Sequence, residues 1–243
     1  MRSPADADPV MSNSTRTPST QRLENSTVVV VGAGSGIGRR LADDLTALGA
    51  TVVRTARHPR DGDQRLDLGD EASIAELAAT VGPVDHVVIL AAAHANGPVA
   101  DLELEAVRRA FDAKVLGPLL LAKHLEIRPG GSIVLFSGVA AHRPQPGLVV
   151  MATTNGAAEH LAQALAVELA PIRVNAVSPG IVDSGAWDRL GPEKDEFLAS
   201  TAAANPARRV GTTQDLSEAV VALLANPFIT GTTLHVDGGG RLA

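Results

Sequence analysis

The chain contains no tyrosine and no cysteine, and aromatic residues make up only 2% of its 243 residues. Without cysteine there is no disulfide, no thiolate nucleophile and no cysteine-ligated zinc, which fits a reducing compartment. Without tyrosine, no phenol is present to act as a general acid or base. Because hydrophobic residues still reach 45%, we expect a core built from Ala, Val, Leu and Ile.

Long apolar runs and positive charge are also scarce. No run reaches the ~20 residues that a membrane helix needs, so no membrane partner is expected. The net charge of −6 argues against a nucleic-acid surface, and no metal-ligand spacing is found. Residues 1–24 are rich in Ser, Thr, Pro and Asp and lack a signal-peptide apolar stretch, which predicts a disordered tail on a cytoplasmic protein. Residues 25–243 are predicted to form one domain.

Short runs of β-branched residues alternate with longer Ala/Leu-rich segments of helical period. This pattern predicts an α/β fold, a Rossmann-like doubly wound parallel sheet of about seven strands with helices on both faces. The predicted strands are Thr27–Val31, Thr51–Thr55, Gln64–Asp67, Val84–Leu90, Ser132–Ser137, Arg173–Val177 and Thr232–Val236. The predicted helices are Gly36–Leu48, Asp70–Val81, Leu102–His124, Val149–Leu169, Ser184 to about Ala204, and Thr213–Ala225. The polar segment 182–211 is predicted to be a mobile substrate lid.

A glycine-rich stretch, VVVVGAGSGIG, follows the first predicted strand and opens the first predicted helix. Glycine at 32, 36 and 38 permits a tight turn, a close approach of the backbone to a pyrophosphate, and close packing of the helix on the strand. The stretch therefore predicts a dinucleotide-binding loop rather than a plain βα turn. Its predicted cofactor residues are Gly32, Gly34, Ser35, Gly36, Ile37 and Gly38.

The spacing Gly-x-x-x-Gly-Ile-Gly resembles that of the short-chain dehydrogenase/reductase family. RLDLGDEASI, RVNAVSPGIVDSG and TLHVDGGGRL resemble three later segments of the same family, so the resemblance runs from about Ser26 to the C-terminus. It implies an oxidoreductase that acts on a small carbonyl or alcohol with a nicotinamide cofactor, and a homodimer or homotetramer. The further cofactor contacts that it implies are Asp67, Leu68, Ala91, Asn155, Pro179, Gly180, Ile181, Val182 and Ser184.

The end of the second strand bears on the choice of cofactor. Family members that prefer NAD carry an acidic residue there, whereas this chain has Ala56 followed by Arg57. A guanidinium binds a 2′-phosphate that a carboxylate would repel, so NADP(H) is favoured. The alternative is that Arg57 is a solvated charge in an Arg-rich loop.

The family's catalytic tetrad of Asn, Ser, Tyr and Lys supplies a proton donor, a cation that tunes it, and a hydrogen bond at the developing oxyanion. Counted along the helix that contains Glu159 and Glu168, these four positions hold Lys114, Gly138, Met151 and Asn155. The adjacent Ser137 matches a non-catalytic serine of the family. Asn155 retains the capacity to bond ribose hydroxyls.

Three other side chains are candidates for the missing proton donor. Lys114, His94 and His142 belong to segments that should meet at the C-terminal edge of the sheet, where ligands of open α/β sheets bind. A buried lysine with a lowered pKa, or a histidine near neutrality, could replace the phenol. The alternative is that the lysine is structural and both histidines are exposed loop residues.

Several functions are therefore compatible with the sequence. One is an atypical reductase, and a second is a catalyst that uses the pocket without hydride transfer. A third is a non-catalytic nucleotide-binding, regulatory or scaffold homologue. A hydrolase triad of Asp183, Ser184 and His142 is disfavoured because the serine is not on a nucleophile elbow.

Overall fold

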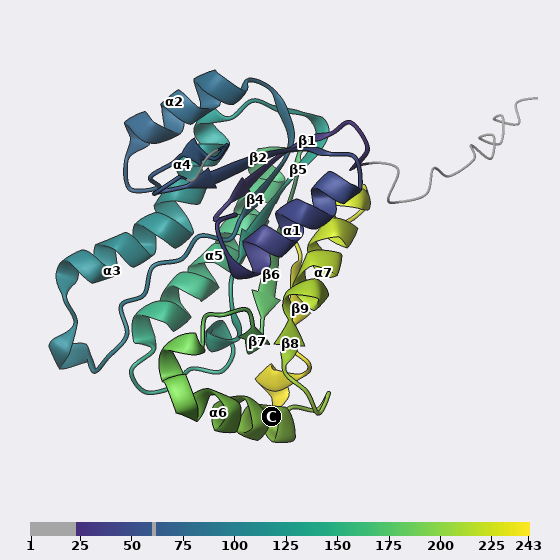
Figure 1. Ribbon diagram of the computed structural model, residues 1–243. Coiled ribbons are helices and arrows are strands. Elements are labelled where there is room, and N and C mark those ends of the chain that lie inside the picture. Colours follow the sequence, from purple (N-terminus) through teal and green to yellow (C-terminus); the bar gives the residue numbers. More distant parts are fainter. Residues whose placement is uncertain (1–22, 60–61) are drawn as a thin grey trace, which may run out of the picture.

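The computed structural model of the protein describes residues 23–59 and 62–243 (Figure 1). Nearly all of the predicted N-terminal tail lies outside these residues. Leu23, within the predicted tail, is fully buried against the core. The folded part therefore includes residues before 25.

Seven parallel strands form the central sheet, as predicted. They are β1 (Thr27–Val31), β2 (Thr51–Ala56), β3 (Gln64–Arg65), β4 (Val84–Ile89), β5 (Ile127–Phe136), β6 (Arg173–Pro179) and β9 (Thr233–Val236). Their order is β3-β2-β1-β4-β5-β6-β9. The chain changes direction across the sheet between β1 and β4, so the crevice at the C-terminal ends of these two strands is where this topology binds ligands.

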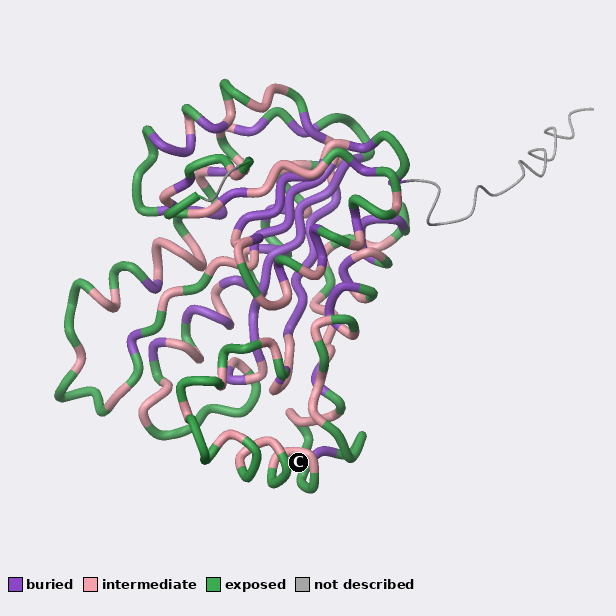
Figure 2. Tube along the Cα trace, viewed as in Figure 1, coloured by how far each residue is buried: buried purple, intermediate pink, exposed green. Residues whose placement is uncertain are grey.

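Helices cover both faces of the sheet (Figure 1). One face carries α2 (Glu71–Val81), α4 (Gly117–His124) and α5 (Val149–Glu168), and the other carries α1 (Gly36–Ala47) and α7 (Thr213–Ala225). Alternate residues of β1 separate the two cores, with Val29 and Val31 in one and Val28 and Val30 in the other. Because the central strands β1, β4, β5 and β6 are largely buried, they need the near-continuous Val/Ile/Leu runs seen in the sequence (Figure 2).

The helix predicted over 102–124 is not continuous. It consists of α3 (Leu104–Phe111), a π-helical turn η3 (Asp112–Leu116) and α4. Pro118 has no N–H to donate to the carbonyl of Lys114, so the regular α-helical ladder breaks at this point. The π-helical turn contains Lys114, and such turns often occur at functional sites.

The segment predicted as a lid begins and ends on a small parallel ladder of β7 (Val182–Asp183) and β8 (Gly211–Thr212). Between them lie a 3-10 stretch η5 (Asp188–Glu193) and α6 (Lys194–Ala204), so the helical part starts later than the predicted Ser184. Gly185 has φ +88°, which is incompatible with helix. No residue of α6 is buried, in contrast to the central strands (Figure 2).

Shorter 3-10 turns complete the described chain, at η2 (Val99–Asp101), η4 (Val139–Ala141) and η6 (Gly240–Leu242). Within the described ranges, every helix is too short or too polar to cross a lipid bilayer.

Candidate functional site

The glycine loop after β1 is held by main-chain contacts. Gly32 and Gly36 have φ of +92° and +51°, which only glycine adopts readily. A Cβ on Gly38 would lie 2.2 Å from the carbonyl oxygen of Gly32, so the first turn of α1 packs directly on the loop. Helix α1 therefore begins directly at the end of β1, where the free N–H groups of a first helical turn can bind an anion.

Other residues that the sequence assigned to the cofactor gather around the same loop. A Cβ on Gly36 would meet the carbonyl oxygen of Ser184 at 2.8 Å, and one on Gly32 would meet the nitrogen of Ala91 at 3.3 Å. Gly34 and Ser35 belong to the loop itself, and Ile37 lies in the first turn of α1. Val182 is the first residue of β7, the short strand directly before Ser184. The structure thus brings together the ends of β1 and β4 and the residue that follows β7.

The remaining predicted contacts lie on either side of that centre. Asp67 Oδ1 accepts a 3.0 Å hydrogen bond from the Gly69 backbone, and the Leu68 side chain packs against Gly117 of α4. Pro179 ends β6, and Gly180 lies so close to Asp237 that a Cβ would be 2.8 Å from its Cα. These residues shape turns at the rim of the crevice.

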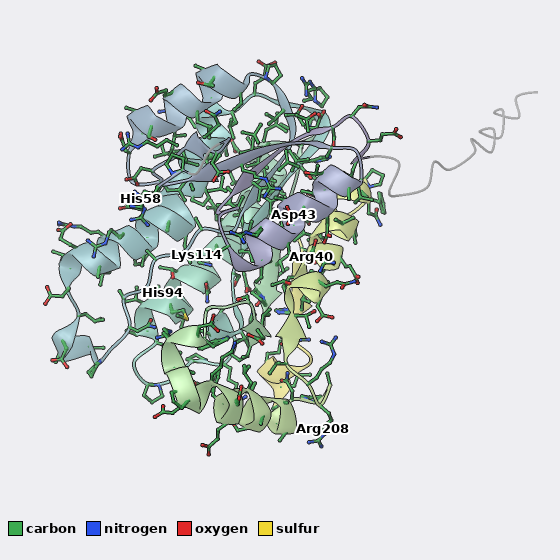
Figure 3. The ribbon with its side chains drawn as sticks, in the orientation of Figure 1. Arg40, Asp43, His58, His94, Lys114 and Arg208 are labelled. Atoms are coloured by element: carbon green, nitrogen blue, oxygen red, sulfur yellow. The ribbon has the colours of Figure 1, made fainter. Side chains whose placement is uncertain are left out.

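Arg57 is exposed directly after β2, beside the labelled His58 (Figure 3). In the described part of the chain it has no hydrogen-bond or ion-pair partner. Arg54, in β2 itself, is bonded to Asp43 of α1 at 2.7 Å. Arg57 is therefore free to bind an anion and Arg54 is already neutralised.

Lys114 extends from the π-helical turn to the end of β5. Its Nζ donates hydrogen bonds to the carbonyl oxygens of Phe136 at 2.7 Å and Ser137 at 3.4 Å. The side chain is packed among Ile89, Ala91, Ala113, Pro118, Leu135 and Phe136. Burial among these apolar groups lowers the pKa of the ammonium from 10.5 to about 8.

His94 lies near this lysine, in the segment that follows β4 (Figure 3). Burial lowers the pKa of His94, and the cations of Lys114 and Arg189 lower it further. His94 is therefore a neutral imidazole at neutral pH.

His142 is bound elsewhere. Its Nε2 lies 2.9 Å from Glu159 Oε2 of α5, and its ring meets His235 edge-on with centroids 4.6 Å apart. Glu159 also accepts a 2.6 Å hydrogen bond from the Ser137 hydroxyl. The sequence did not predict this Ser–Glu–His cluster, because nothing in the spacing of its residues indicates that they meet.

Gly138 and Asn155 are in direct contact. A Cβ built on Gly138 would lie 2.8 Å from Asn155 Nδ2, although the backbone of Gly138 is extended and open to any residue. The Ser137 hydroxyl lies 3.1 Å from the Asn155 carbonyl oxygen and so ties α5 to the end of β5. Met151 is one turn earlier on α5 and half-buried. Lys114, Gly138 and Asn155 thus meet at one strand end.

Two other site types are not assembled. The residues of the hydrolase alternative have other partners: Asp183 pairs with Lys194 at 2.9 Å, and His142 pairs with Glu159. Across residues 23–59 and 62–243, no three His, Cys, Asp or Glu side chains cluster in a way that could hold a metal ion.

Known proteins of similar sequence show to which family this arrangement belongs. The model of a family described as enoyl-(acyl carrier protein) reductase matches residues 32–240. L-xylulose reductase from Bos taurus is 31% identical over 90% of this chain and 97% of its own length. The chain belongs to the short-chain dehydrogenase/reductase family.

Solved structures of the family agree with this assignment. A small-chain dehydrogenase in complex with NADPH shares 35% identity with a TM-score of 0.83, over 90% of this chain and all of the other. The reductase/Diels-Alderase MalC from Malbranchea aurantiaca shares 28% identity with a TM-score of 0.84, over 93% of this chain and all of the other. The resemblance inferred from the glycine spacing is confirmed at the level of family and fold.

The residues of the crevice fit a nicotinamide dinucleotide, the cofactor of the family. The cradle at Gly36 and Gly38 leaves no room for side chains, which is the shape that a pyrophosphate needs. Arg57, which has no partner among residues 23–59 and 62–243, lies at the strand end where the adenosine ribose is expected.

Proposed function

We propose that this chain is an NADP(H)-dependent oxidoreductase that acts on a small carbonyl or alcohol, with Lys114 as its proton donor. One observation carries the proposal: Nζ of Lys114 lies at the end of β5, beside the position of the family's catalytic serine, with a pKa lowered to about 8. A donor with a pKa near neutrality is what general acid catalysis needs. The Lys114 ammonium would thus take the place of the tyrosine that the sequence lacks.

The cofactor-binding part of the proposal rests on the loop at Gly32–Gly38, on Ser184 above it, and on Arg57. NADPH, when bound, supplies a hydride to the carbonyl carbon. The loop binds the pyrophosphate through backbone N–H groups, and Arg57 binds the 2′-phosphate through charge-assisted bonds. That a related small-chain dehydrogenase was solved with NADPH supports this choice.

The protein's own part in reduction is to hold the carbonyl oxygen and protonate it. Lys114 Nζ donates two of its three N–H groups to the backbone carbonyl oxygens of Phe136 and Ser137. The third N–H group remains for a substrate oxygen. As negative charge develops on that oxygen, one proton passes from Nζ to it and an alcohol forms. The neutral amine then recovers a proton from water, because the pKa of the neighbouring His94 is lowered and its imidazole is a weaker base than the amine.

The test follows NADPH consumption over a panel of aldehydes, ketones, β-keto esters and quinones. Replacing Lys114 by Met should lower kcat by about 10²- to 10⁴-fold, because a general acid contributes that much. Lys114→Arg should be equally inactive, since a guanidinium keeps its proton. Wild-type kcat should fall as pH rises through about 8, where Nζ loses its charge.

Lys123→Met is the matched control. Lys123 lies on the neighbouring helix α4, where it is exposed and bound to Glu71 at 2.6 Å. This variant should keep wild-type kcat. Full turnover by Lys114→Met would exclude the lysine as donor, and NADPH binding without turnover of any substrate would instead favour a non-catalytic, nucleotide-binding homologue.

A second candidate, catalysis without hydride transfer, is supported by MalC, which is described as a reductase and Diels-Alderase. A cycloaddition needs a shaped pocket and no proton donor, so a chain without tyrosine meets its requirements. Conversion of a diene and dienophile that is unaffected by omission of NADPH and by Lys114→Met would favour this candidate.

We further propose that the chain forms a homodimer or homotetramer through α4 and α5. Both helices carry exposed apolar side chains, with Leu119 44% and Val167 82% exposed. Isolated apolar side chains are common on surfaces, but two neighbouring helices that both carry them favour an interface. Sedimentation equilibrium of the full chain measures the assembly directly.

A further inference from the structure

Asn155 combines burial with an unused hydrogen-bonding group. The residue is only 4% exposed, and its side-chain amide has no hydrogen-bond partner among the described residues. A buried amide without a partner is costly, and native structures rarely leave one. However, neither atom of this amide is completely shielded from solvent. The amide atoms therefore keep a small exposed area through which a ligand can reach them.

The direction of this amide follows from Gly138. Of all atoms, Asn155 Nδ2 is the nearest to a Cβ built on Gly138, at 2.8 Å, with Cγ at 3.5 Å and Oδ1 at 3.8 Å. The amide nitrogen thus occupies part of the volume that a side chain at 138 would use. In the family that side chain is a serine, whose hydroxyl orients the substrate carbonyl.

Two further contacts fix the group in place. The Ser137 hydroxyl lies 3.1 Å from the backbone carbonyl oxygen of Asn155, and this contact holds this turn of α5 against β5. Lys114 Nζ donates to the carbonyl oxygens of Phe136 and Ser137, the two residues before Gly138. An amide N–H and an ammonium N–H are therefore both anchored at the end of β5.

We propose that the Asn155 side-chain amide replaces the serine hydroxyl of the family and donates a hydrogen bond to the substrate oxygen. Gly138 is the counterpart of this change, because only a residue without Cβ leaves room for the amide. Asn155 and Lys114 together then form a two-donor site for an oxygen that becomes negative during reduction. The inference rests on the proposed oxidoreductase function and differs from a role in binding the cofactor ribose.

Kinetics of four variants test the assignment on a carbonyl compound that the wild type reduces. Asn155→Ala should lower kcat by about 100-fold, because loss of one such donor has that effect, while the Kd for NADPH, measured by fluorescence titration, stays within about twofold. Gly138→Ser should also lose activity, because its side chain meets the amide. The double variant Gly138→Ser/Asn155→Ala should recover at least about tenfold over Asn155→Ala. Thr154→Val, a buried neighbour on α5 whose hydroxyl bonds only to its own helix, should keep full activity.

Thermal unfolding provides a readout that does not depend on turnover. Gly138→Ala should lower the melting temperature by about 5 °C through overpacking. In the Asn155→Ala background the same change should have almost no effect, since the obstructing group is gone. Equal destabilisation in both backgrounds would show that the amide does not occupy this volume, and the proposal would fall.

Contact with the oxygen is measured by NMR on protein with ¹⁵N-labelled asparagine, saturated with NADP⁺ so that no reduction takes place. The Asn155 amide signal, identified by its loss in Asn155→Ala, should shift as cyclohexanone is added. A wild type that reduces carbonyls while this signal stays fixed and Asn155→Ala keeps full kcat would overturn the inference and leave the proposed function intact. A signal that shifts in a protein without turnover would show that a carbonyl compound binds at Asn155, and would reject both the reductase function and the role of the amide in reduction.

Discussion

The loop between β1 and α1 and the junction between β5 and α5 lie at the same edge of the sheet, and both depend on a glycine that no side chain can replace as the structure stands. At the loop, the atom in the way of a Cβ on Gly38 is the main-chain oxygen of Gly32, 2.2 Å away. At the junction, the atom in the way of a Cβ on Gly138 belongs to the side chain of Asn155. A main-chain obstacle is the same in every variant, whereas a side-chain obstacle disappears with one substitution. The loop is therefore specified by backbone geometry and the junction by a pair of residues.

The largest expected effect comes from Gly38→Ala. The added Cβ must push α1 off the loop, which should cost about 3 kcal/mol or more and lower the melting temperature by roughly 10 °C. NADPH should then no longer raise the melting temperature. Gly156→Ala is the control, since nothing lies within 4 Å of its added Cβ, and it should stabilise α5 by about 0.5–1 kcal/mol. A second substitution that rescued Gly38→Ala would contradict the distinction between the two regions.

The next largest effect is a pH dependence of the stability of the protein, which arises from Lys114 at the junction and not from the loop. Lys114 has a pKa of about 8 in the folded protein and 10.5 when unperturbed, so between these pH values the unfolded chain binds a proton that the folded protein does not. Stability should therefore rise with pH across this window, by about 3 kcal/mol at most. In Lys114→Met the rise should vanish, as measured by urea unfolding at pH 8 and pH 10. An equal rise in both proteins would assign it to other groups.

The smallest effect concerns the rim of the loop. Arg57→Ala should weaken NADPH binding about 10- to 100-fold, because a hydrogen bond to a charged group contributes about 1.5–3 kcal/mol. NADH binding should not change, since NADH has no 2′-phosphate. Arg54→Ala, which removes a guanidinium already paired with Asp43, should leave the preference for NADPH intact. Calorimetric titration of both nucleotides measures the difference, and an unaltered preference in Arg57→Ala would disprove the role of Arg57.

The sequence predicted the fold more fully than the site, for physical reasons that particular residues illustrate. Strand β1 and helix α7 begin and end where periodicity placed them, because buried β-branched runs and amphipathic repeats are local signals. The π-helical turn at Asp112–Leu116 was missed because apolar residues continue at helical spacing through 102–124, although Pro118, in the interior of that predicted helix, marks the break.

At the site, the sequence suggested by resemblance which positions correspond to the tetrad, and the structure shows the contacts that the residues at these positions make. The contact between Gly138 and Asn155 joins residues that are far apart in the chain and differs from the family pattern, so no local rule predicts it. The same holds for the bonds of Glu159 to Ser137 and His142. Roles assigned from segment convergence alone, as for His142, depend on side-chain directions that a sequence does not contain.

The contact between Gly138 and Asn155 also sets the order in which substitutions can accumulate. A chain with serine at 138 has no space for this orientation of an asparagine amide, and a chain with that amide in place has no space for serine. Each single step back toward the family pattern therefore passes through a strained protein unless position 155 first changes to a smaller residue. Placing a hydroxyl at 138 therefore requires two changes, and the change at 155 must come first.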